Sequence, residues 1–282
     1  MKNDNEKKCV AIALCALYSD WINHKDLIIK SFENIKSAFH DECIFLLAIQ
    51  GAEDNKIEAI PGFDSVEIFY LNALGISLAR NRCIEEAIKL DCKWIIFHDA
   101  TLFWPRSSAK FIYDHRNDRY PPRIKLKFSD AAATEAQDFS FEFKELNPIY
   151  NFTVGLILFE LDKIKAVRFN ENHGPGERTV YKSGEDVLFI FDYFTQKNDF
   201  YVNEANSLYV FHPPRSEDYL KHRVYAKGQG RVFRILLKQH FSFRLLRDCA
   251  FFFGNAVFRC ILLRKNSLTI LRDRLAGFFD EV

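Results

Sequence analysis

Two adjacent carboxylates stand at the beginning of an apolar stretch in the second half of the chain. The segment "VYKSGEDVLFIFDYF" (180–194) places Glu185 and Asp186 after a glycine and before mostly apolar residues. This pattern predicts a helix from 185 whose first turn holds both acids. Acids in that position complement the helix dipole, by about 0.3–1 kcal/mol each. Carboxylates can also exchange protons with a ligand, and the pair alone leaves both roles open.

Polar side chains also follow three apolar segments of strand length. The segments 43–49, 66–71 and 93–98 each lead into charged or amide side chains. Because the carboxyl ends of parallel strands lie at one edge of a sheet, we expect these groups to meet Glu185 and Asp186 there. The sequence therefore predicts a pocket of acids that contains one arginine. Its members are, in chain order, Asp54, Arg80 with Asn81, and His98 with Asp99.

Each of these groups also has a purely structural interpretation. Asp54 lies in "GAEDN" (51–55), and Asp and Asn commonly stabilise turns. Arg80 and Asn81 fit equally well on a helix face that packs against the sheet. We expect His98 to be a hydrogen-bonded histidine at a strand end, with metal ligation as the alternative.

Apolar segments and helical periodicity alternate over the first hundred residues. Continuous apolar runs predict strands that are buried on both faces, and apolar residues spaced by three and four predict helices. Alternation of the two predicts an α/β fold with a mostly parallel sheet and helices on its faces. The predicted strands are 9–17, 43–49, 66–71, 93–98 and 151–161, and the predicted helices are 24–38 and 75–90.

The other segments are less regular. We expect 105–150 to be an irregular insertion that crosses the sheet, because polar, Pro-containing stretches alternate there with short aromatic runs. Gly174, Pro175 and Gly176 predict a turn within the loop 169–184. Residues 199–212 predict two short strands, and three helical stretches follow from about 217.

Length and composition fit one large domain, or one domain with a smaller appendage. The seven cysteines are scattered without a Cys-x-x-Cys pair, which indicates reduced thiols in the cytoplasm and neither disulfides nor a zinc site. Residues 1–17 do not have the pattern of a signal peptide. No apolar run reaches the roughly 18 residues that cross a bilayer.

The C-terminal region is basic, whereas the rest of the chain is acidic. From Glu217 onward there are 13 Lys and Arg against 6 Asp and Glu, compared with 26 against 32 before it. Arg and Lys alternate with Phe and Leu at helical spacing, a pattern typical of helices on an anionic membrane. The alternatives are a helical subdomain packed on the main domain and a nucleic-acid-binding element, although we expect no nucleic acid partner.

Three blocks of the sequence resemble family 2 glycosyltransferases with the GT-A fold. "GISLARNRCIEEA" (75–87) and the strand ending "FHDATLF" (97–103) are similar to that family's G-x-S-x-A-R-N-x-x-I segment and to the strand that ends in its DXD motif. "FNENHGPGERTVYKSGEDVLF" (169–189) is similar to its F-D-E…G-x-G…G-E-D segment. "YVNEANSLYVFH" (201–212) is similar to a strand that ends in His.

The resemblance implies transfer of a sugar from a nucleotide-sugar donor to a hydroxyl of a glycan or lipid-linked glycan acceptor, with inversion at the anomeric carbon. A carboxylate must then take the proton of the attacking hydroxyl, and the resemblance implies that Asp186 is this general base. Glu185 would position acceptor hydroxyls or the helix start. Gly174, Pro175 and Gly176 would form the acceptor loop. The residues that would bind the donor are Asp54, Arg80, Asn81 and Asp99.

The resemblance also implies a metal ion. Asp99 corresponds to the first acid of the DXD motif, which holds Mn²⁺ or Mg²⁺ against the donor diphosphate. His212 corresponds to a histidine near the metal or diphosphate. This chain departs from the motif at Thr101, which stands where the second acid is expected, so the implied metal site is incomplete. The first strand leads into Tyr18-Ser19-Asp20 and not into the family's Pro-x-Tyr-Asn, so donor contacts at that strand do not carry over.

We therefore expect a GT-A domain over 1–216 and a basic, Phe-rich helical region over 217–282 that contacts an anionic membrane or forms a homo-oligomer. The predicted function is an inverting glycosyltransferase of bacterial-type surface polysaccharide biosynthesis, located in the cytoplasm or peripherally on the inner face of the cell membrane. The alternative is a catalytically inactive module of the same fold that binds a nucleotide or a glycan, which the incomplete DXD motif favours.

Overall fold

A five-stranded sheet forms the centre of the computed structural model, which describes residues 10–40, 42–52, 57, 60–63, 65–129, 140–151, 153–214 and 219–280. Four strands are parallel: β1 (Val10–Leu17), β2 (Cys43–Gln50), β3 (Val66–Leu71) and β4 (Trp94–His98). The short strand β7 (Phe159–Glu160) pairs antiparallel with β4, which gives the order β3-β2-β1-β4-β7. The predicted α/β class and the mostly parallel sheet are confirmed.

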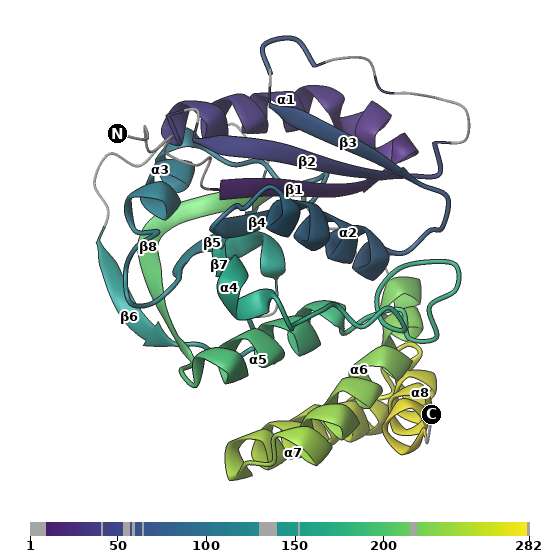
Figure 1. Cartoon of the computed structure of the whole chain (residues 1–282). Helices are drawn as coiled ribbons and strands as arrows, with labels where there is room; N and C mark the ends of the chain where they lie inside the picture. Colours follow the sequence, from purple (N-terminus) through teal and green to yellow (C-terminus); the bar gives the residue numbers. More distant parts are fainter. Residues whose placement is uncertain are drawn as a thin grey trace.

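Helices cover both faces of this sheet (Figure 1). On one face lie α1 (Tyr18–Ala38) and α3 (Arg106–Asp114), and on the other lie α2 (Ile76–Lys89), α4 (Leu161–Ile164) and α5 (Glu185–Lys197). Alternate residues of β1 enter the two resulting cores, so Ile12 packs with α1 while Ala13 packs with α2 and α5. Burial on both faces explains why the strands are continuously apolar.

The first predicted helix begins earlier than the periodicity suggested. Strand β1 runs directly into α1 at Tyr18, six residues before the predicted start at 24. The extra residues are helical because Trp21 is buried in the core beneath them. Tyr18, Ser19 and Asp20 therefore form the first turn of α1, above the carboxyl end of β1.

The predicted irregular insertion at 105–150 contains regular structure, and this prediction was wrong in part. Besides α3, it supplies β5 (Pro122–Phe128) and β6 (Phe141–Glu145) to a second sheet with the order β5-β8-β6. The central strand β8 (Tyr201–His212) is one long strand, not the two short strands predicted for 199–212. Within this strand Glu204 is buried in an ion pair with Arg123, and its Oε1 atom lies 3.1 Å from Nζ of Lys144.

The apolar run 151–161 is buried but is not the single strand that was predicted. It forms a 3-10 turn at Val154–Leu156, the two-residue strand β7 and the start of α4. Gly155 lies so close to β4 that a Cβ atom there would stand 3.1 Å from the carbonyl oxygen of Phe97. The neighbouring residue Val154 donates its backbone N–H to Asp186 at the start of α5.

Three helices complete the chain: α6 (Tyr219–Gln239), α7 (Phe243–Ile261) and α8 (Ser267–Phe279). They confirm the predicted helical character of the C-terminal region. Within the described ranges, none of the helices has the length and apolar character needed to cross a membrane. Helices α6 and α8 approach closely at two glycines, because a Cβ atom at Gly230 would overlap the carbonyl oxygen of Arg274, and one at Gly277 would overlap that of Lys227.

We predict that Gly277→Ala separates α8 from α6 and lowers the melting temperature, because overpacking of a tight contact typically costs about 1–3 kcal/mol. Thermal unfolding and limited proteolysis of the C-terminal helices measure the effect. Gly254→Ala in α7 is the matched control, since nothing lies within 4 Å of a Cβ atom there. The control should be neutral or stabilising, because Ala favours a helix over Gly by about 1 kcal/mol. Equal stability of the two variants would contradict the packing described.

Candidate functional site

Four charged side chains from three separate segments meet at the carboxyl edge of the parallel sheet. Asp99 directly follows β4, Arg80 lies on α2, and Glu185 and Asp186 form the first residues of α5. The prediction that these groups gather at one edge is confirmed for all four. The structure brings Arg80 and Asp186, which are 106 positions apart in sequence, into direct contact.

Arg80 is the centre of this group. Its Nη1 atom donates a hydrogen bond to Oδ1 of Asp186 at 2.5 Å and lies 3.9 Å from Oε1 of Glu185. Its Nη2 atom donates to Oδ1 of Asp99 at 3.2 Å. The Arg80 side chain is only 4% exposed, whereas that of Asp99 is 35% exposed. One buried cation therefore contacts three carboxylates, and Asp99 forms the open side of the group.

Aromatic rings fix the Arg80 guanidinium from the other side. Its central carbon lies 5.1 Å from the centre of the Phe169 ring and 6.0 Å from that of Phe97. Phe169 is itself stacked on Phe189 of α5, with the two ring centres 3.9 Å apart. Burial alone would lower the pKa of Arg80, but Asp186, Asp99 and Glu185 together raise it above its ordinary value. The arginine therefore stays charged.

The two adjacent acids respond to burial in the same direction. Burial raises the pKa of Glu185 to about 7, Asp186 adds to the rise, and Arg80 opposes it. The pKa of Asp186 is also raised by burial, against the opposing effect of Arg80. The second carboxylate oxygen of Asp186 accepts a weaker hydrogen bond from the backbone N–H of Val154 at 3.4 Å. A carboxyl group whose pKa is raised to about 7, as that of Glu185 is, is suited to proton transfer near neutral pH.

The loop 169–184 lies against the start of α2, beside the acids. The backbone N–H of Ile76 donates to the carbonyl of Pro175 at 3.0 Å, and the Ser77 hydroxyl donates to the carbonyl of His173 at 2.7 Å. Gly174 has a positive φ of 99°, and a Cβ atom there would press against Glu185. The predicted turn at Gly174, Pro175 and Gly176 is confirmed, and it packs directly beside the carboxylate pair.

The same loop is held from below by α6. Gly184, the residue before the two acids, has a φ of 100°, and a Cβ atom there would collide with Val232 of α6. The Ser183 hydroxyl donates to the carbonyl of Tyr225 at 2.9 Å. The C-terminal helices therefore support the turn from which α5 begins.

Asn81 and His98 are placed differently from the four charged residues. Asn81 is turned toward the loop, where its amide donates to the carbonyl of Phe169 and to Glu171, and accepts from the N–H of Phe169. Asp54 lies outside the described residues. His98 points to the opposite face of the sheet and bonds Ser31 of α1 at 2.8 Å, and its burial lowers its pKa to about 4. The expected structural role of His98 is confirmed.

The described residues do not form a recognisable metal site. Among them, no group of three or more His, Cys, Asp or Glu is arranged to hold a metal ion. His212 bonds the carbonyl of Pro213 at 2.6 Å and contacts the ring of Phe128, at the end of the second sheet. Asp99 offers one carboxylate and Thr101 only a hydroxyl, a donor set that fits Mn²⁺ or Mg²⁺ poorly without further ligands. The metal stays a prediction from the resemblance.

Several contributors to the site were missed from the sequence. Phe97 and Phe169 appeared only as apolar residues, and the Val154 N–H is a backbone group that has no sequence signal. Glu171 could have been predicted, because "FNEN" (169–172) places an acid in the segment 169–189 that resembles the glycosyltransferases. Its bond to Asn81 at 2.9 Å ties that loop to α2.

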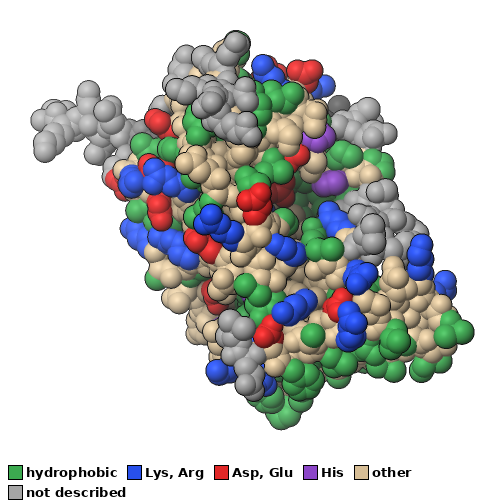
Figure 2. Space-filling model, turned by 90° about the vertical axis from the view of Figure 1, so that its right-hand side faces the viewer, with side chains coloured by type: hydrophobic (Ala, Val, Ile, Leu, Met, Phe, Trp, Pro, Cys, Tyr) green, Lys and Arg blue, Asp and Glu red, His purple; other side chains and the backbone are tan. Residues whose placement is uncertain are grey.

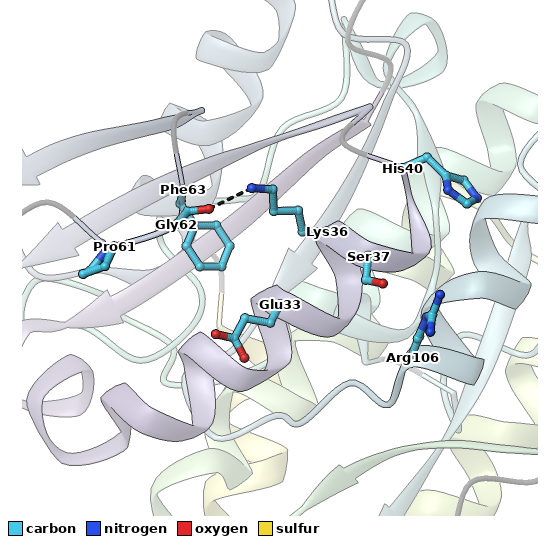
Figure 3. A pocket seen from close by; sticks show the side chains of 8 residues that line it. All are labelled: Glu33, Lys36, Ser37, His40, Pro61, Gly62, Phe63 and Arg106. Atoms are coloured by element: carbon cyan, nitrogen blue, oxygen red, sulfur yellow. Dashed lines mark hydrogen bonds between the residues drawn. The ribbon is translucent and has the colours of Figure 1, made fainter.

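A separate open cavity of about 500 Å³ lies on the α1 side of the sheet (Figure 3). It lies beside the last turns of α1, and Figure 3 shows Lys36 bonded across it to the Gly62 carbonyl, at 2.7 Å. Helix α1 runs back from the carboxyl end of β1, so this cavity belongs to the opposite end of the strands from Arg80. It is not the candidate site.

Comparison with known proteins gives structural matches only. The sequence matches no protein-family model and no curated protein. Three solved structures of TarS residues 1–349 from S. aureus are similar to this chain in overall fold. The crystal structure in complex with UDP is 16% identical with a TM-score of 0.49, over 83% of this chain and 72% of that one. The UDP-GlcNAc complex is 14% identical with a TM-score of 0.48, over 83% of this chain and 73% of that one. The structure of 1–349 alone is 14% identical with a TM-score of 0.49, over 96% of this chain and 88% of that one.

We predict that Glu185→Gln stabilises the protein at about pH 8 but not at about pH 4. A raised folded-state pKa means that the folded state binds more protons, so the free energy of unfolding falls as pH rises from about 4.5 to about 7. Glutamine does not titrate, so the Glu185→Gln variant does not lose this stability as the pH rises. Because 1 kcal/mol shifts the melting temperature by about 2–4 °C at this chain length, we expect a difference of several degrees by calorimetry.

Glu67→Gln, at an exposed position of β3, is the control and should change little at either pH. A difference in melting temperature between Glu185→Gln and the parent that does not grow with pH would contradict a buried, destabilised Glu185 carboxylate.

Proposed function

We propose that this chain is an inverting glycosyltransferase that moves a sugar from a nucleotide-sugar donor to a hydroxyl of a glycan or lipid-linked glycan acceptor. The observation that carries the proposal is the convergence of Arg80, Asp99, Glu185 and Asp186 at the carboxyl edge of the parallel sheet. These residues come from the sequence blocks that resemble the GT-A family. Ligands of α/β sheets bind at this edge.

Asp186 acts as the general base in this proposal. Its carboxylate takes the proton from the acceptor hydroxyl as the oxygen attacks the anomeric carbon, on the face opposite the leaving nucleoside diphosphate. Arg80 holds one carboxylate oxygen in place. Among the described residues, the other oxygen accepts only the long hydrogen bond from the Val154 N–H, so it is better able to accept a proton. Attack from that face breaks the bond to the diphosphate and inverts the anomeric carbon.

The neighbouring groups position the reactants. Glu185, whose raised pKa lets it carry a proton near neutral pH, suits a hydrogen bond to an acceptor hydroxyl. The loop at Gly174 to Gly176 lies beside it and would contact the acceptor. Asp99, on the open side, would face the donor. No step is assigned to a metal ion, because the described donor set around Asp99 fits one poorly.

A binding module without catalysis is the second candidate. Two observations favour it: Thr101 stands in place of a second acid, and Arg80 already occupies one oxygen of the proposed base. Such a module would gain stability from a nucleoside diphosphate or its sugar, because any ligand that binds only the folded state raises its melting temperature. It would neither transfer nor hydrolyse the sugar with any acceptor.

We predict that Asp186→Asn lowers sugar transfer by about 10²–10⁴-fold, the usual contribution of a general base. The measurement is release of nucleoside diphosphate over a panel of nucleotide sugars and glycan acceptors, with donor binding followed by the shift in melting temperature. Asp192→Asn is the matched control on the same helix, since its side chain is 44% exposed and faces His240. The control should keep both sugar transfer and donor binding, whereas Asp186→Asn should bind the donor but lose transfer.

Transfer by Asp186→Asn at the parental rate would show that Asp186 is not the base. Donor binding by the parent chain without transfer or hydrolysis would support the binding module instead.

A further inference from the structure

Helix α7 is apolar on two opposite sides, although only one of them is covered. The inner side, with Leu245, Cys249 and Ala256, is buried against α5, α6 and α8. A surface helix normally presents polar residues on its other side. The outer side of α7 instead exposes Phe243, Leu246, Phe251, Val257, Phe258 and Ile261, which are between 45% and 83% exposed. We call these six residues the outer surface of α7.

The apolar character continues past the end of α7. Leu263 in the turn to α8 is 90% exposed, and Leu268 in the first turn of α8 is 73% exposed. Figure 2 shows hydrophobic side chains gathered along the lower edge of the molecule, the edge that the C-terminal helices form in Figure 1. Contiguous apolar surface of this kind usually marks an interaction site.

Basic side chains accompany this surface. Residues 243–279 contain seven Lys or Arg, two Asp and no Glu. One of the two acids, Asp248, is 2% exposed and bonded to Asn147 and Arg247, while Arg259, Arg264 and Lys265 are exposed around the end of α7. Lys and Arg side chains lie above the hydrophobic edge in Figure 2. The surface therefore combines exposed Phe and Leu with an excess of positive charge.

We propose that the outer surface of α7, with the turn to α8, docks on a lipid bilayer that contains anionic lipids. Apolar side chains would enter the boundary between headgroups and acyl chains, and the arginines would contact lipid phosphates. Helix α7 would lie in the plane of the membrane, in accord with the finding that no described helix has the length and apolar character to cross it. Docking is independent of the proposed chemistry.

Charge distinguishes a bilayer from a second copy of the chain. In a two-fold dimer this surface would pack against its own copy, so the excess of Lys and Arg on the two copies would be brought together in one interface. Like charges brought together across an interface oppose association. An anionic bilayer supplies the opposite charge.

The docked surface is connected to the candidate site through α6. Helix α6 packs against α7 at Phe233, whose ring lies 4.7 Å from that of Phe252, and against Gly184 at Val232. A chain docked through α7 therefore holds Glu185 and Asp186 at a fixed position relative to the membrane. This arrangement would suit an acceptor that is itself anchored in the bilayer.

We predict that the full chain floats with vesicles containing about one-third phosphatidylglycerol and much less with pure phosphatidylcholine. The triple variant Phe251→Ser, Phe258→Ser and Ile261→Ser should lose flotation. Arg259→Gln and Arg264→Gln should each weaken binding by about fivefold, the equivalent of about 1 kcal/mol per charge near the surface. Phe143→Ser, at a 58% exposed position of β6, is the matched control and should float like the parent.

Unchanged melting temperatures would show that the variants are folded, and the single arginine variants test the surface independently of the triple change. The proposal is overturned if the parent floats with neither vesicle, or if the triple variant floats as well as the parent. It is also overturned if sedimentation shows a parent dimer that the triple variant abolishes while neither binds lipid.

Discussion

The buried ion pair between Arg80 and Asp186 is the interaction on which the arrangement of the candidate site depends. Three carboxylates with side-chain exposures of 13% to 35% lie at the same edge of the sheet. Without a cation they would repel one another while each lost solvation, a combination that commonly costs several kcal/mol. Arg80 contacts all three, and the rings of Phe97 and Phe169 hold its guanidinium in position. The pKa of Glu185 is still raised, so the compensation is incomplete.

This constraint extends from the sheet edge to the end of the chain. Arg80 can reach the two acids only because the chain turns at Gly184 and starts α5 there. Helix α6 packs on that turn, and α8 packs on α6 through Gly230 and Gly277. The predicted boundary at 216 therefore falls between segments that contact each other closely. The C-terminal helices support the site and also carry the apolar surface proposed to meet the membrane.

Sequence reasoning predicted the parts of this structure that repeat a simple pattern. The parallel strands and α2 followed from apolar runs and helical spacing, and their order placed Arg80, Asp99, Glu185 and Asp186 at one edge.

Sequence reasoning failed where tertiary contacts override the local pattern. The run 151–161 is as apolar as a strand, but it forms a 3-10 turn at Val154–Leu156, where Gly155 lies close to Phe97. Strand β8 is continuous because Arg123 neutralises its buried Glu204, a partner 81 positions away in the printed sequence. Asn81 was predicted to bind the donor, whereas in the structure its side chain holds Phe169 and Glu171, through a loop conformation that residue spacing does not define.

A double-mutant cycle at Arg80 and Asp186 tests the central claim most directly. The free energy of unfolding would be measured for the parent, Arg80→Met, Asp186→Asn and the double variant by denaturant titration at neutral pH. The account predicts that the double variant loses less stability than the sum of the single losses, with a coupling of about 1–3 kcal/mol, because each single change leaves a buried charge without its partner. Losses that add to within about 0.5 kcal/mol would contradict it, and would mean that the Arg80–Asp186 pair does not hold the site together.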